Sequence, residues 1–430
     1  MSDASPNRIP VAVIGGGQAG LSISHYLREA GIAHLVFEKK TAMHVWREQR
    51  WDTFCLVTPN WQCDLPGHPY DGPDPDGFMK RDEIVAYLDR FRAKVDAPLR
   101  EGVSVLRVGR RADGAFDVAT SDGDYVADQV VVASGGYTVP IIPRMAERLP
   151  AHVRQLHSEQ YRNPQALPDG AVLVVGSGQS GAQIAEDLHL AGRKVHLAVG
   201  GAPRCARFYR GKDVVTWLAE MNYYEMSVDQ HPLREGVRDN TNHYVTGRDG
   251  GRDIDLRKFA LEGMQLYGLL DGLDGGSVTF RPTLTAALDE ADRVYNGINA
   301  AIDRHIAEAG IAAPPASVYT PVWQPAAEPT ALDLDAAGVT AIIWCIGFRP
   351  DFAWLDVPAF NGAGHPKHRR GVAAETGVYF LGLPWLHSWG SGRFSGVSRD
   401  ARYLADRIVE RLKAPEEVRS DGIRQFVAAG

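Results

Sequence analysis

Two glycine-rich segments, 15–20 and 176–181, constrain the fold of this chain more than any other feature. Each follows a short apolar run, 9–14 for the first and 171–175 for the second, that is typical of a buried strand. A stretch with helical spacing of apolar residues comes next and stops at a glycine, eleven residues after the third motif glycine in both copies. The order of strand, glycine turn and helix begins a βαβ unit. We therefore predict an α/β chain that contains two copies of one supersecondary unit.

Both segments have the spacing G-x-G-x-x-G of a dinucleotide-binding turn. The first glycine permits the tight turn, the second lets the backbone approach a pyrophosphate, and the third lets the helix pack closely on the strand. Backbone N–H groups at the helix N-terminus attract the phosphates. Because each motif lies between a predicted strand and a predicted helix, we predict two bound dinucleotides. The candidate contacts are Gly15, Gly17, Gln18, Ala19 and Gly20 in the first copy, and Gly176, Ser177, Gly178, Gln179, Ser180 and Gly181 in the second.

An acidic residue distinguishes the two copies. Glu38 ends the second predicted strand of the first copy, where a carboxylate can accept hydrogen bonds from ribose hydroxyls. The matching position of the second copy is Gly200, and Arg204 and Arg207 follow it. Arginine binds a 2′-phosphate that an acid would repel, so we predict NADPH at the second site with these two arginines as contacts. The alternative that they are solvated loop charges stays open.

The first site is expected to hold FAD, because two copies of one cofactor would have nothing to exchange.

The composition fits a folded protein, with 44% hydrophobic and 23% charged residues. The net charge is −7 without a block of like charge, which argues against binding to nucleic acid or a membrane surface.

No run of apolar residues is long enough for a membrane helix, and the start lacks the pattern of a signal peptide, so we expect a cytoplasmic protein. The four cysteines are scattered without a C-x-x-C pair. This pattern excludes zinc ribbons, iron–sulfur centres and dithiol redox motifs, and we predict no metal site.

Further motifs extend the pattern, and together they resemble a known family. The glycine segments and Glu38 are similar to those of flavoproteins with two dinucleotide-binding domains, as are the segments 344–350 and 377–384. More narrowly, the chain resembles the class B flavin-dependent monooxygenases and their CzcO-like bacterial branch. The segments that carry this likeness are 51–60, 65–67 and 156–164.

The resemblance covers nearly the whole chain and weakens across 209–329. It implies two Rossmann-like dinucleotide-binding domains, with the NADPH domain inserted into a discontinuous FAD domain. We expect the FAD domain at 1–163 and 346–430, and the NADPH domain at 164–345 with a variable insertion at about 209–329. Between the glycine motifs, the sequence predicts a helix at 82–95, a hairpin meander at 103–127, a buried strand at 130–133 and a linker at 137–168.

The resemblance also implies a reaction. NADPH would reduce FAD, O₂ would add to the flavin at C4a, and one oxygen atom would pass to nitrogen, sulfur or a carbonyl group of a small organic substrate. Trp46 would then contact FAD, and Thr58 and Asn60 would lie in the segment that approaches the flavin. Asn60 could bond near the oxygen adduct, although a turn-forming asparagine after Pro59 is an equal alternative.

One departure from the family concerns its linker motif, F-x-G-x-x-x-H with an aromatic residue four positions on. His157 and Tyr161 fit this motif, whereas Ala151 and Val153 replace the phenylalanine and the glycine. The half-present motif is compatible with the class B flavin-dependent monooxygenases in general and gives no support to Baeyer–Villiger activity. His157 is either a hinge residue that senses NADP or a structural linker histidine.

Three further clusters are less specific. One cluster could line the substrate cavity or simply pack in the core; it consists of Trp385, His387, Trp389 and Arg393. A second, in the insertion, could cover the site or lie on the surface; it consists of Asn242, His243, Tyr244 and Arg248. A third suggests a metal or phosphate site by its number of basic residues but fits a solvated loop better; it consists of His365, His368, Arg369 and Arg370.

Two other functions stay open beside the monooxygenase. One is an NADPH-dependent flavin reductase or dehydrogenase without oxygen insertion, and the other is a non-catalytic nucleotide sensor. The expected partners are a small-molecule substrate and O₂, and the sequence leaves a homo-oligomer open.

Overall fold

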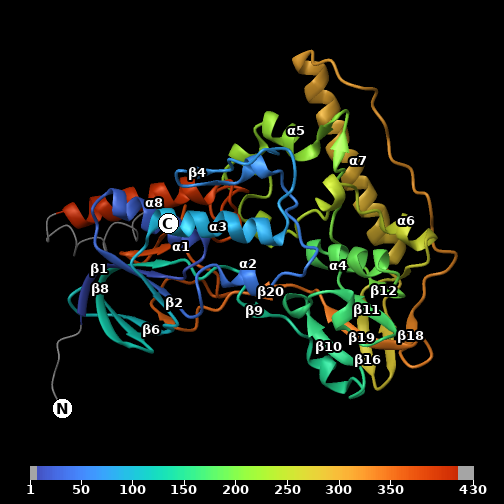
Figure 1. The fold of residues 1–430 in the computed structure, drawn as a ribbon, viewed down its shortest axis with the longest axis horizontal. Helices are drawn as coiled ribbons and strands as arrows, with labels where there is room; N and C mark the ends of the chain where they lie inside the picture. The colour runs from blue at the N-terminus through green and yellow to red at the C-terminus, as the bar shows by residue number, and fades with distance from the viewer. Residues whose placement is uncertain (1–6, 415–430) are drawn as a thin grey trace.

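The computed structural model describes residues 7–414. Two sheets with parallel strands lie side by side, each covered by helices, which confirms the predicted α/β class (Figure 1). Both ends of the chain build the sheet on the left of the view, and the middle of the chain builds the sheet on the right.

Five parallel strands form the centre of the first sheet, in the order β5-β2-β1-β8-β24. Antiparallel pairs extend it from β8 and from β24, and β21 joins β6 in parallel at the far edge, so segments after residue 350 share a sheet with the N-terminus. The parallel strands are β1 (Asn7–Ile14), β2 (His34–Glu38), β5 (Leu99–Glu101), β8 (Gly123–Val132) and β24 (Val378–Phe380). The others are β6 (Val105–Arg110), β7 (Phe116–Thr120), β21 (Leu355–Asp356), β22 (His368–Arg369) and β23 (Val372–Ala373).

Strand β8 differs from the prediction. The last arm of the expected meander and the expected strand at 130–133 are one continuous strand, because β8 pairs with β1 along most of its length. The intervening charge of Asp128 is tolerated, since Arg8 of β1 donates to its carboxylate at 2.6 Å.

The second sheet repeats the central order of the first. Its parallel strands run β15-β12-β11-β19-β10, and β11 and β12 match β1 and β2 in place and direction. They are β10 (Arg154–His157), β11 (Ala171–Val175), β12 (Val195–Ala198), β15 (Gln265–Tyr267) and β19 (Val339–Trp344). Strand β10 lies inside the segment predicted as a linker, yet it pairs with β19.

Helices bury the faces of both sheets. In the first half, α1, α3 and α8 enclose one apolar core against the sheet, with Leu21, Leu27, Leu88 and Leu404 fully buried. In the second half, α4 packs on β11 and β12. Their bounds are α1 (Gln18–Glu29), α3 (Arg81–Val95), α4 (Gln179–Leu190) and α8 (Val397–Lys413), and the short α2 (His44–Glu48) follows β2. Figure 1 shows the red α8 beside the blue α1 and α3.

Most of the segment predicted as an insertion adds a further layer beyond the second sheet, but the segment also supplies β15 to that sheet. Its long helix α7 ends at Gly310, whose φ of +64° favours glycine, and the chain then returns along the outside (Figure 1). Its elements are α5 (Val214–Glu220), α6 (Leu256–Leu261), α7 (Leu284–Ala309), β13 (Phe208–Tyr209), β14 (Lys212–Asp213), β16 (Leu270–Asp274), β17 (Ser277–Phe280) and β18 (Ala331–Asp333). A small hairpin of β3 (Asp64–Leu65) and β4 (His68–Pro69) belongs to the first half.

The chain crosses between the sheets twice, and the two crossings pair with each other. Strand β9 (Val139–Pro140) follows β8, β20 (Phe348–Arg349) follows β19, and the two are antiparallel. We call this pair the crossover. In Figure 1 it lies between the two sheets, next to α2.

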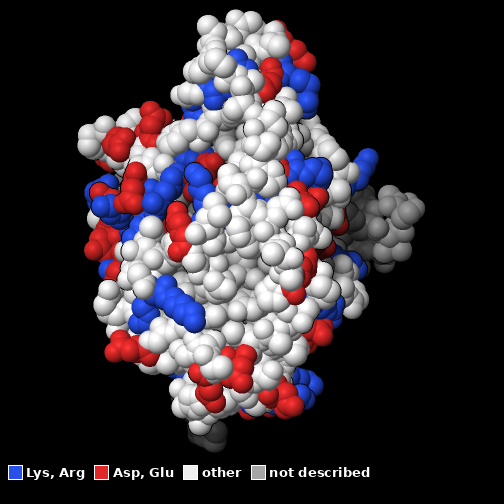
Figure 2. Space-filling view, turned by 90° about the vertical axis from the view of Figure 1, so that its right-hand side faces the viewer, with Lys and Arg blue, Asp and Glu red and all other residues white. Residues whose placement is uncertain are grey.

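The surface carries charges of both signs. On the face shown in Figure 2, Lys and Arg are interspersed with Asp and Glu, and the described part of this face has no extended patch of one sign. This distribution agrees with the prediction from the net charge.

Candidate functional site

The first glycine turn connects β1 to α1 and leaves no room for side chains at two positions. Gly15 has a φ of +114°, and a Cβ atom there would lie 2.4 Å from the carbonyl oxygen of Ala133. A Cβ on Gly20 would lie 1.8 Å from the carbonyl oxygen of Gly15. Gly17, in contrast, has no atom near its missing Cβ, so its surroundings are open to a ligand.

The second glycine turn repeats this geometry between β11 and α4. Gly176 has a φ of +101°, and its Cβ would lie 2.6 Å from the carbonyl oxygen of Cys345. A Cβ on Gly181 would lie 1.9 Å from the carbonyl oxygen of Gly176. Ala133 and Cys345 are the residues that follow β8 and β19, the matching neighbours of β1 and β11. The two turns are therefore equivalent in three dimensions.

Both helices that follow the turns begin without a side-chain cap. Gly17 and Gly178 occupy the N-cap positions of α1 and α4 in extended backbone conformation. The first N–H groups of these helices lack intrahelical partners, and the helix dipole favours negative charge there. These two ends fit the pyrophosphate of a dinucleotide.

Glu38 lies at the end of β2, beside the first turn. Its carboxylate accepts hydrogen bonds from the N–H groups of Gly16 and Lys40, each at 2.8 Å. The side chain is half-buried, so its remaining lone pairs face outward. At the matching place of the second half, the N–H of Gly200 donates to Ser177 Oγ at 3.0 Å instead.

The loop after β24 covers the start of α1. Gln18 Nε2 donates to the carbonyl oxygen of Gly392 at 3.1 Å, and Trp46 Nε1 donates to Gln18 Oε1 at 3.3 Å. Ala19 packs against the same loop, because a Cβ on Gly382 would lie 2.7 Å from its Cβ. This loop contains the residues 385–393 that the sequence placed near the flavin.

A segment of the insertion covers the start of α4. Gln179 Nε2 donates to the carbonyl oxygen of Val245 at 2.7 Å, and the missing Cβ of Gly178 would lie 3.7 Å from Thr241 Cγ2. Arg393 Nη2 donates to Asn242 Oδ1 at 2.8 Å. Residues 241–245 therefore lie between the second turn and the loop that covers the first, and Ser180 is half-buried next to them on α4.

Arg204 and Arg207, which the sequence predicts as contacts of a 2′-phosphate, lie inside the protein. Both side chains are buried and paired inside the protein: Arg204 Nη2 lies 2.8 Å from a carboxylate oxygen of Asp292, and Arg207 Nη2 lies 2.6 Å from one of Asp213. Arg207 also donates to the carbonyl oxygen of Val57. Burial opposes the charge of Arg204, but the nearby aspartates outweigh it and raise its pKa. Both guanidinium groups therefore serve internal ion pairs, and neither is a solvated loop charge.

Asn60 has a structural role in its own loop. Its Nδ2 donates to the carbonyl oxygen of Asp74 at 2.9 Å, and its Oδ1 accepts from the N–H of Met79 at 2.7 Å. The buried side chain thus holds the loop 74–79, in agreement with the turn-forming alternative. Thr58, two residues earlier, is half-buried.

His157 lies at the crossover. The ring of this buried residue stacks edge-on against Phe348 at 4.6 Å, and its Nε2 lies 3.1 Å from the carbonyl oxygen of Gly347. Nδ1 accepts from the N–H of Glu159, which leaves the proton on Nε2. Burial lowers the pKa of His157, so the ring is neutral. Its motif partner Tyr161 donates to Asp187 of α4 at 2.6 Å.

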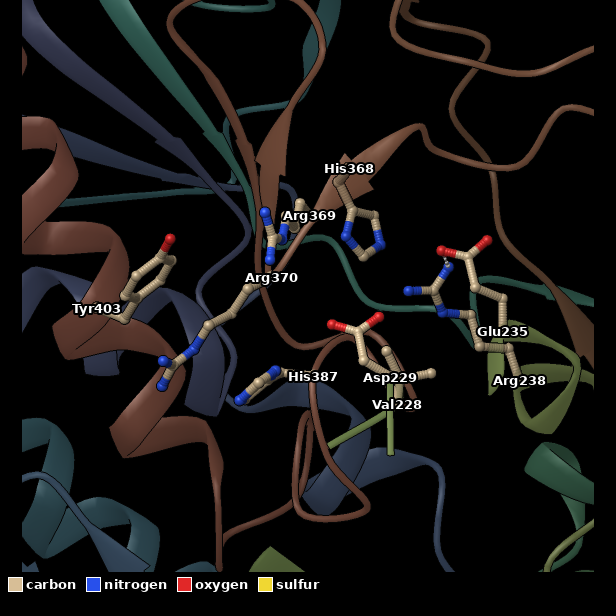
Figure 3. A pocket seen from close by; sticks show the side chains of 9 residues that line it. All are labelled: Val228, Asp229, Glu235, Arg238, His368, Arg369, Arg370, His387 and Tyr403. Carbon is tan, nitrogen blue, oxygen red and sulfur yellow. Dashed lines mark ion pairs between the residues drawn. The ribbon is translucent and has the colours of Figure 1, made fainter. Parts of the chain in front are cut away.

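A separate cavity of about 270 Å³ lies behind the loop that follows β24 (Figure 3). Arg238, which pairs with Glu235 at 3.3 Å, faces the predicted cluster across it. Burial and Arg238 lower the pKa of His368 to about 4. The lining residues are Val228, Asp229, Glu235, Arg238, His368, Arg369, Arg370, His387 and Tyr403. Within residues 7–414 no cluster suited to a metal ion occurs.

Sequence reasoning missed the hydrogen-bond acceptors that hold side chains of the site in place and that are backbone carbonyl groups of distant segments. The carbonyl groups of Gly347 and Gly392, which hold His157 and Gln18, are examples. A sequence carries no signal for such partners, because any residue can supply a carbonyl group.

Comparisons with known proteins agree with this architecture. The profile of the pyridine nucleotide-disulphide oxidoreductase family matches residues 12–227. A CzcO-like oxidoreductase of Geobacillus kaustophilus, itself uncharacterized, is 31% identical over 93% of this chain and 98% of its own length. An indole-3-pyruvate monooxygenase of Oryza sativa is 30% identical over 42% of this chain and 45% of its own length.

Among solved structures, a flavin monooxygenase from Stenotrophomonas maltophilia matches with a TM-score of 0.63 and 20% identity. The match covers 94% of this chain and 99% of that protein, and at this identity it is a likeness of fold. In residues 7–414, no helix combines the length and the apolar character that crossing a membrane requires. The chain belongs to the pyridine nucleotide-disulphide oxidoreductase family and, within it, to the CzcO-like oxidoreductases.

Proposed function

We propose that this protein is an NADPH-dependent flavin monooxygenase, in which FAD binds at the first glycine turn, NADPH binds at the second, and one oxygen atom of O₂ passes to a small organic substrate. The observation that carries the proposal is the equivalence of the two turns, each followed by an uncapped helix. Two dinucleotide sites that face one junction are what hydride exchange between two cofactors requires.

The residues of the first half fit FAD. The N–H groups at the start of α1 would hold the pyrophosphate, and Gly17 gives the backbone room to approach it. Glu38, fixed by two backbone N–H groups, would accept hydrogen bonds from the ribose. Trp46 and Gln18 would cover the pyrophosphate side.

The residues of the second half fit a pyridine nucleotide. The N–H groups at the start of α4 would hold its pyrophosphate, and Ser177 fixes the turn through Gly200. The preference for NADPH over NADH rests on the absence of a carboxylate at Gly200, since both predicted arginines serve internal ion pairs. An uncharged ribose pocket admits a 2′-phosphate, which a carboxylate would repel.

The domain organisation follows the two sheets. An FAD domain built from both ends of the chain would enclose an NADPH domain from the middle. Because β10 pairs with β19, we place the boundary before Arg154 rather than at 163. His157 and Gly347 then join the start and the end of the inserted domain at the crossover, and this contact fixes how the two sites face each other.

Bound FAD would supply the redox chemistry, accepting hydride from NADPH and activating O₂. The protein's own residues keep the two cofactors aligned and exclude water. The loop 385–393 and the segment 241–245 lie over the two turns and touch each other through Arg393 and Asn242. Exclusion of water at this junction would favour oxygen transfer over release of hydrogen peroxide.

A reductase that exchanges thiols is disfavoured by the cysteines. All four are free, and the described residues contain no disulfide. Burial raises the pKa of the Cys55 thiol to about 11 and that of Cys63 to about 12. A thiol that stays protonated is a poor nucleophile, so this alternative lacks its reactive group.

The experiment is a reaction of the purified flavin-loaded protein with NADPH under ¹⁸O₂. We expect NADPH to bleach the flavin faster than NADH, and one ¹⁸O atom to enter an amine, thioether or ketone from a substrate panel. Flavin reduction with every electron recovered as hydrogen peroxide, for all members of the panel, would contradict oxygen transfer and favour the reductase. Failure to bind flavin at all would favour the non-catalytic sensor.

A further inference from the structure

Two arginines near the crossover, Arg50 and Arg393, have no carboxylate partner. Residues 7–414 supply no ion pair to either, whereas the buried Arg204, Arg207 and Arg257 each pair with aspartate. Arg50 Nη1 donates to the carbonyl oxygen of its neighbour Gln49 at 2.9 Å. Arg393 donates only to neutral oxygens, on Asn242 and Trp389. Each guanidinium group therefore keeps unused N–H donors and an unneutralised charge.

Both guanidinium groups lie over aromatic rings. The Cζ atom of Arg50 is 5.0 Å from the ring centre of Trp46 and 5.3 Å from that of Phe54. The Cζ atom of Arg393 is 4.0 Å from the ring centre of Trp389. Stacking fixes the plane of a guanidinium group and leaves its edge of N–H donors for a bidentate acceptor.

The two charges are partly buried and remain reachable. Burial lowers the pKa of Arg50 to about 10, although the hydroxyl of Tyr137 and the carboxylate of Glu159 act in the opposite direction from a distance. Burial also lowers the pKa of Arg393. Both side chains are nevertheless only half-buried, so open space reaches them. A partly desolvated charge is costly where the described residues give it no carboxylate partner, and the carboxylate of a ligand would offset that cost.

The two arginines belong to one place. Phe394, the neighbour of Arg393, packs on Trp46 with ring centres 5.0 Å apart, and Trp46 is the ring under Arg50. The phenol of Tyr137 lies close enough to both guanidinium groups to raise the pKa of each against the effect of burial. Tyr137 is 59% exposed and stacks edge-on against Phe348 of the crossover, which locates the pair at the junction of the two proposed cofactor sites.

We infer that Arg50 and Arg393 together bind a carboxylate of the organic substrate, so that the substrates of this protein are carboxylic acids with an apolar body. The inference rests on the proposed function, since it names the substrate class of the same site. The aromatic rings of Trp46, Phe54 and Trp389 would contact the apolar body, and a guanidinium edge matches the two oxygens of a carboxylate. The pyrophosphates of the two cofactors have their own proposed sites at the starts of α1 and α4.

The test compares two probes of nearly the same shape, phenylacetate and phenylacetamide, on the oxidised flavin-loaded protein without NADPH. Binding is followed by the flavin absorbance and by tryptophan fluorescence, because Trp46 and Trp389 lie under the arginines. We expect phenylacetate to bind at least about tenfold more tightly than the amide, as a hydrogen-bonded charge pair would give. The variants Arg50→Gln and Arg393→Gln should each lose this difference and retain the affinity for the amide.

Three controls separate this site from folding and from cofactor binding. Arg369→Gln, an exposed arginine of the cavity in Figure 3, should leave both affinities unchanged. Arg50→Lys keeps the charge without the bidentate edge and should lose only part of the preference. Flavin content and the affinity for NADP⁺ should stay within about twofold of the wild type in every variant.

Equal affinity of the wild type for both probes would overturn the inference. Loss of FAD or NADP⁺ affinity in the glutamine variants, with phenylacetate binding intact, would overturn it as well and assign the arginines to a cofactor phosphate. Loss of oxygen transfer is a different failure: a protein that binds phenylacetate through these arginines but never incorporates ¹⁸O supports the site and contradicts the monooxygenase.

Discussion

His157 Nε2 donates a hydrogen bond of 3.1 Å to the carbonyl oxygen of Gly347, and this bond joins residues 190 positions apart at the crossover. The N–H of Ile141 donates to the same carbonyl oxygen at 3.0 Å, so both crossings of the chain meet at one acceptor. The relative position of the two halves thus depends on a contact between the start of one crossing and the end of the other.

Replacing His157 should loosen the crossover. His157→Ala removes one donor from a buried carbonyl group, and we expect the free energy of unfolding to fall by about 1–3 kcal/mol. His157→Gln can still donate and should recover part of this loss. Hydrogen exchange of the Ile141 amide should accelerate in the alanine variant, whereas exchange of Val131 in β8 should not. Equal exchange of Ile141 in both variants and the wild type would show that the crossover does not depend on this bond.

The open glycines should discriminate the two nucleotide sites. Gly17→Ala and Gly178→Ala place a methyl group where no atom or only Thr241 is near, so both variants should fold. We expect each to weaken one dinucleotide by at least about tenfold, FAD for the first and NADP⁺ for the second, because the methyl group keeps the phosphates from the backbone. Isothermal titration of both ligands measures the effect.

Two glycine variants serve as controls for that experiment. Gly297→Ala on α7 meets no neighbouring atom and should leave both affinities unchanged. Gly20→Ala would bring a methyl group within 1.8 Å of the carbonyl oxygen of Gly15 and should prevent correct folding of the first half. If Gly17→Ala left FAD binding intact, the first turn could not be the pyrophosphate site.

Arg204 should matter for stability and not for the choice between NADPH and NADH. Its guanidinium group is buried between Asp292 and the rings of Tyr295 and Tyr319. Arg204→Ala removes one of the two guanidinium partners of the buried Asp292, which Arg257 also contacts at 2.8 Å, and should cost about 1–3 kcal/mol of unfolding free energy. The exposed Arg281, paired with Asp271, should cost at most about 1 kcal/mol when replaced by alanine. A loss of NADPH preference at unchanged stability would restore the 2′-phosphate assignment.

The stability of the protein should fall with acid through His196. Its Nδ1 lies 2.9 Å from the hydroxyl of Tyr267, its Nε2 is buried without a partner, and burial lowers its pKa to about 4. The unfolded chain, with a histidine pKa of about 6.5, takes up the proton first as the pH falls. Stability contributed by this group is therefore complete above pH 6.5 and is lost from there toward pH 4.

Denaturant unfolding between pH 7.5 and 5 measures this dependence. The slope due to His196 is at most about 1.4 kcal/mol per pH unit, and His196→Gln should reduce the total slope by that amount. An identical slope in wild type and His196→Gln would mean that His196 does not remain neutral in the folded protein.

The sequence predicted most of the two βαβ starts, because their determinants are local. A glycine at φ above +100° and a glycine packed against the preceding turn have few alternatives, so the motifs at 15–20 and 176–181 define strand, turn and helix together. The continuous strand β8 and the strand β10 in the predicted linker were missed. Both depend on pairing with strands far along the chain, β1 and β19, which no local pattern records.

The side chains of the site also fall into two groups, those whose role follows from the local sequence and those whose role depends on distant segments. The sequence by itself determined the glycine turns, the carboxylate of Glu38 and the absence of an acid at Gly200, since each follows from residue type and spacing. Only the tertiary structure decided that Arg204 pairs with Asp292 and that Asn60 holds the loop at Met79. It alone also brought Arg50 and Arg393 to one place without a counterion. The physical reason is that a charge or an amide is used by whichever partner folding brings nearest, and that partner lies up to hundreds of residues away.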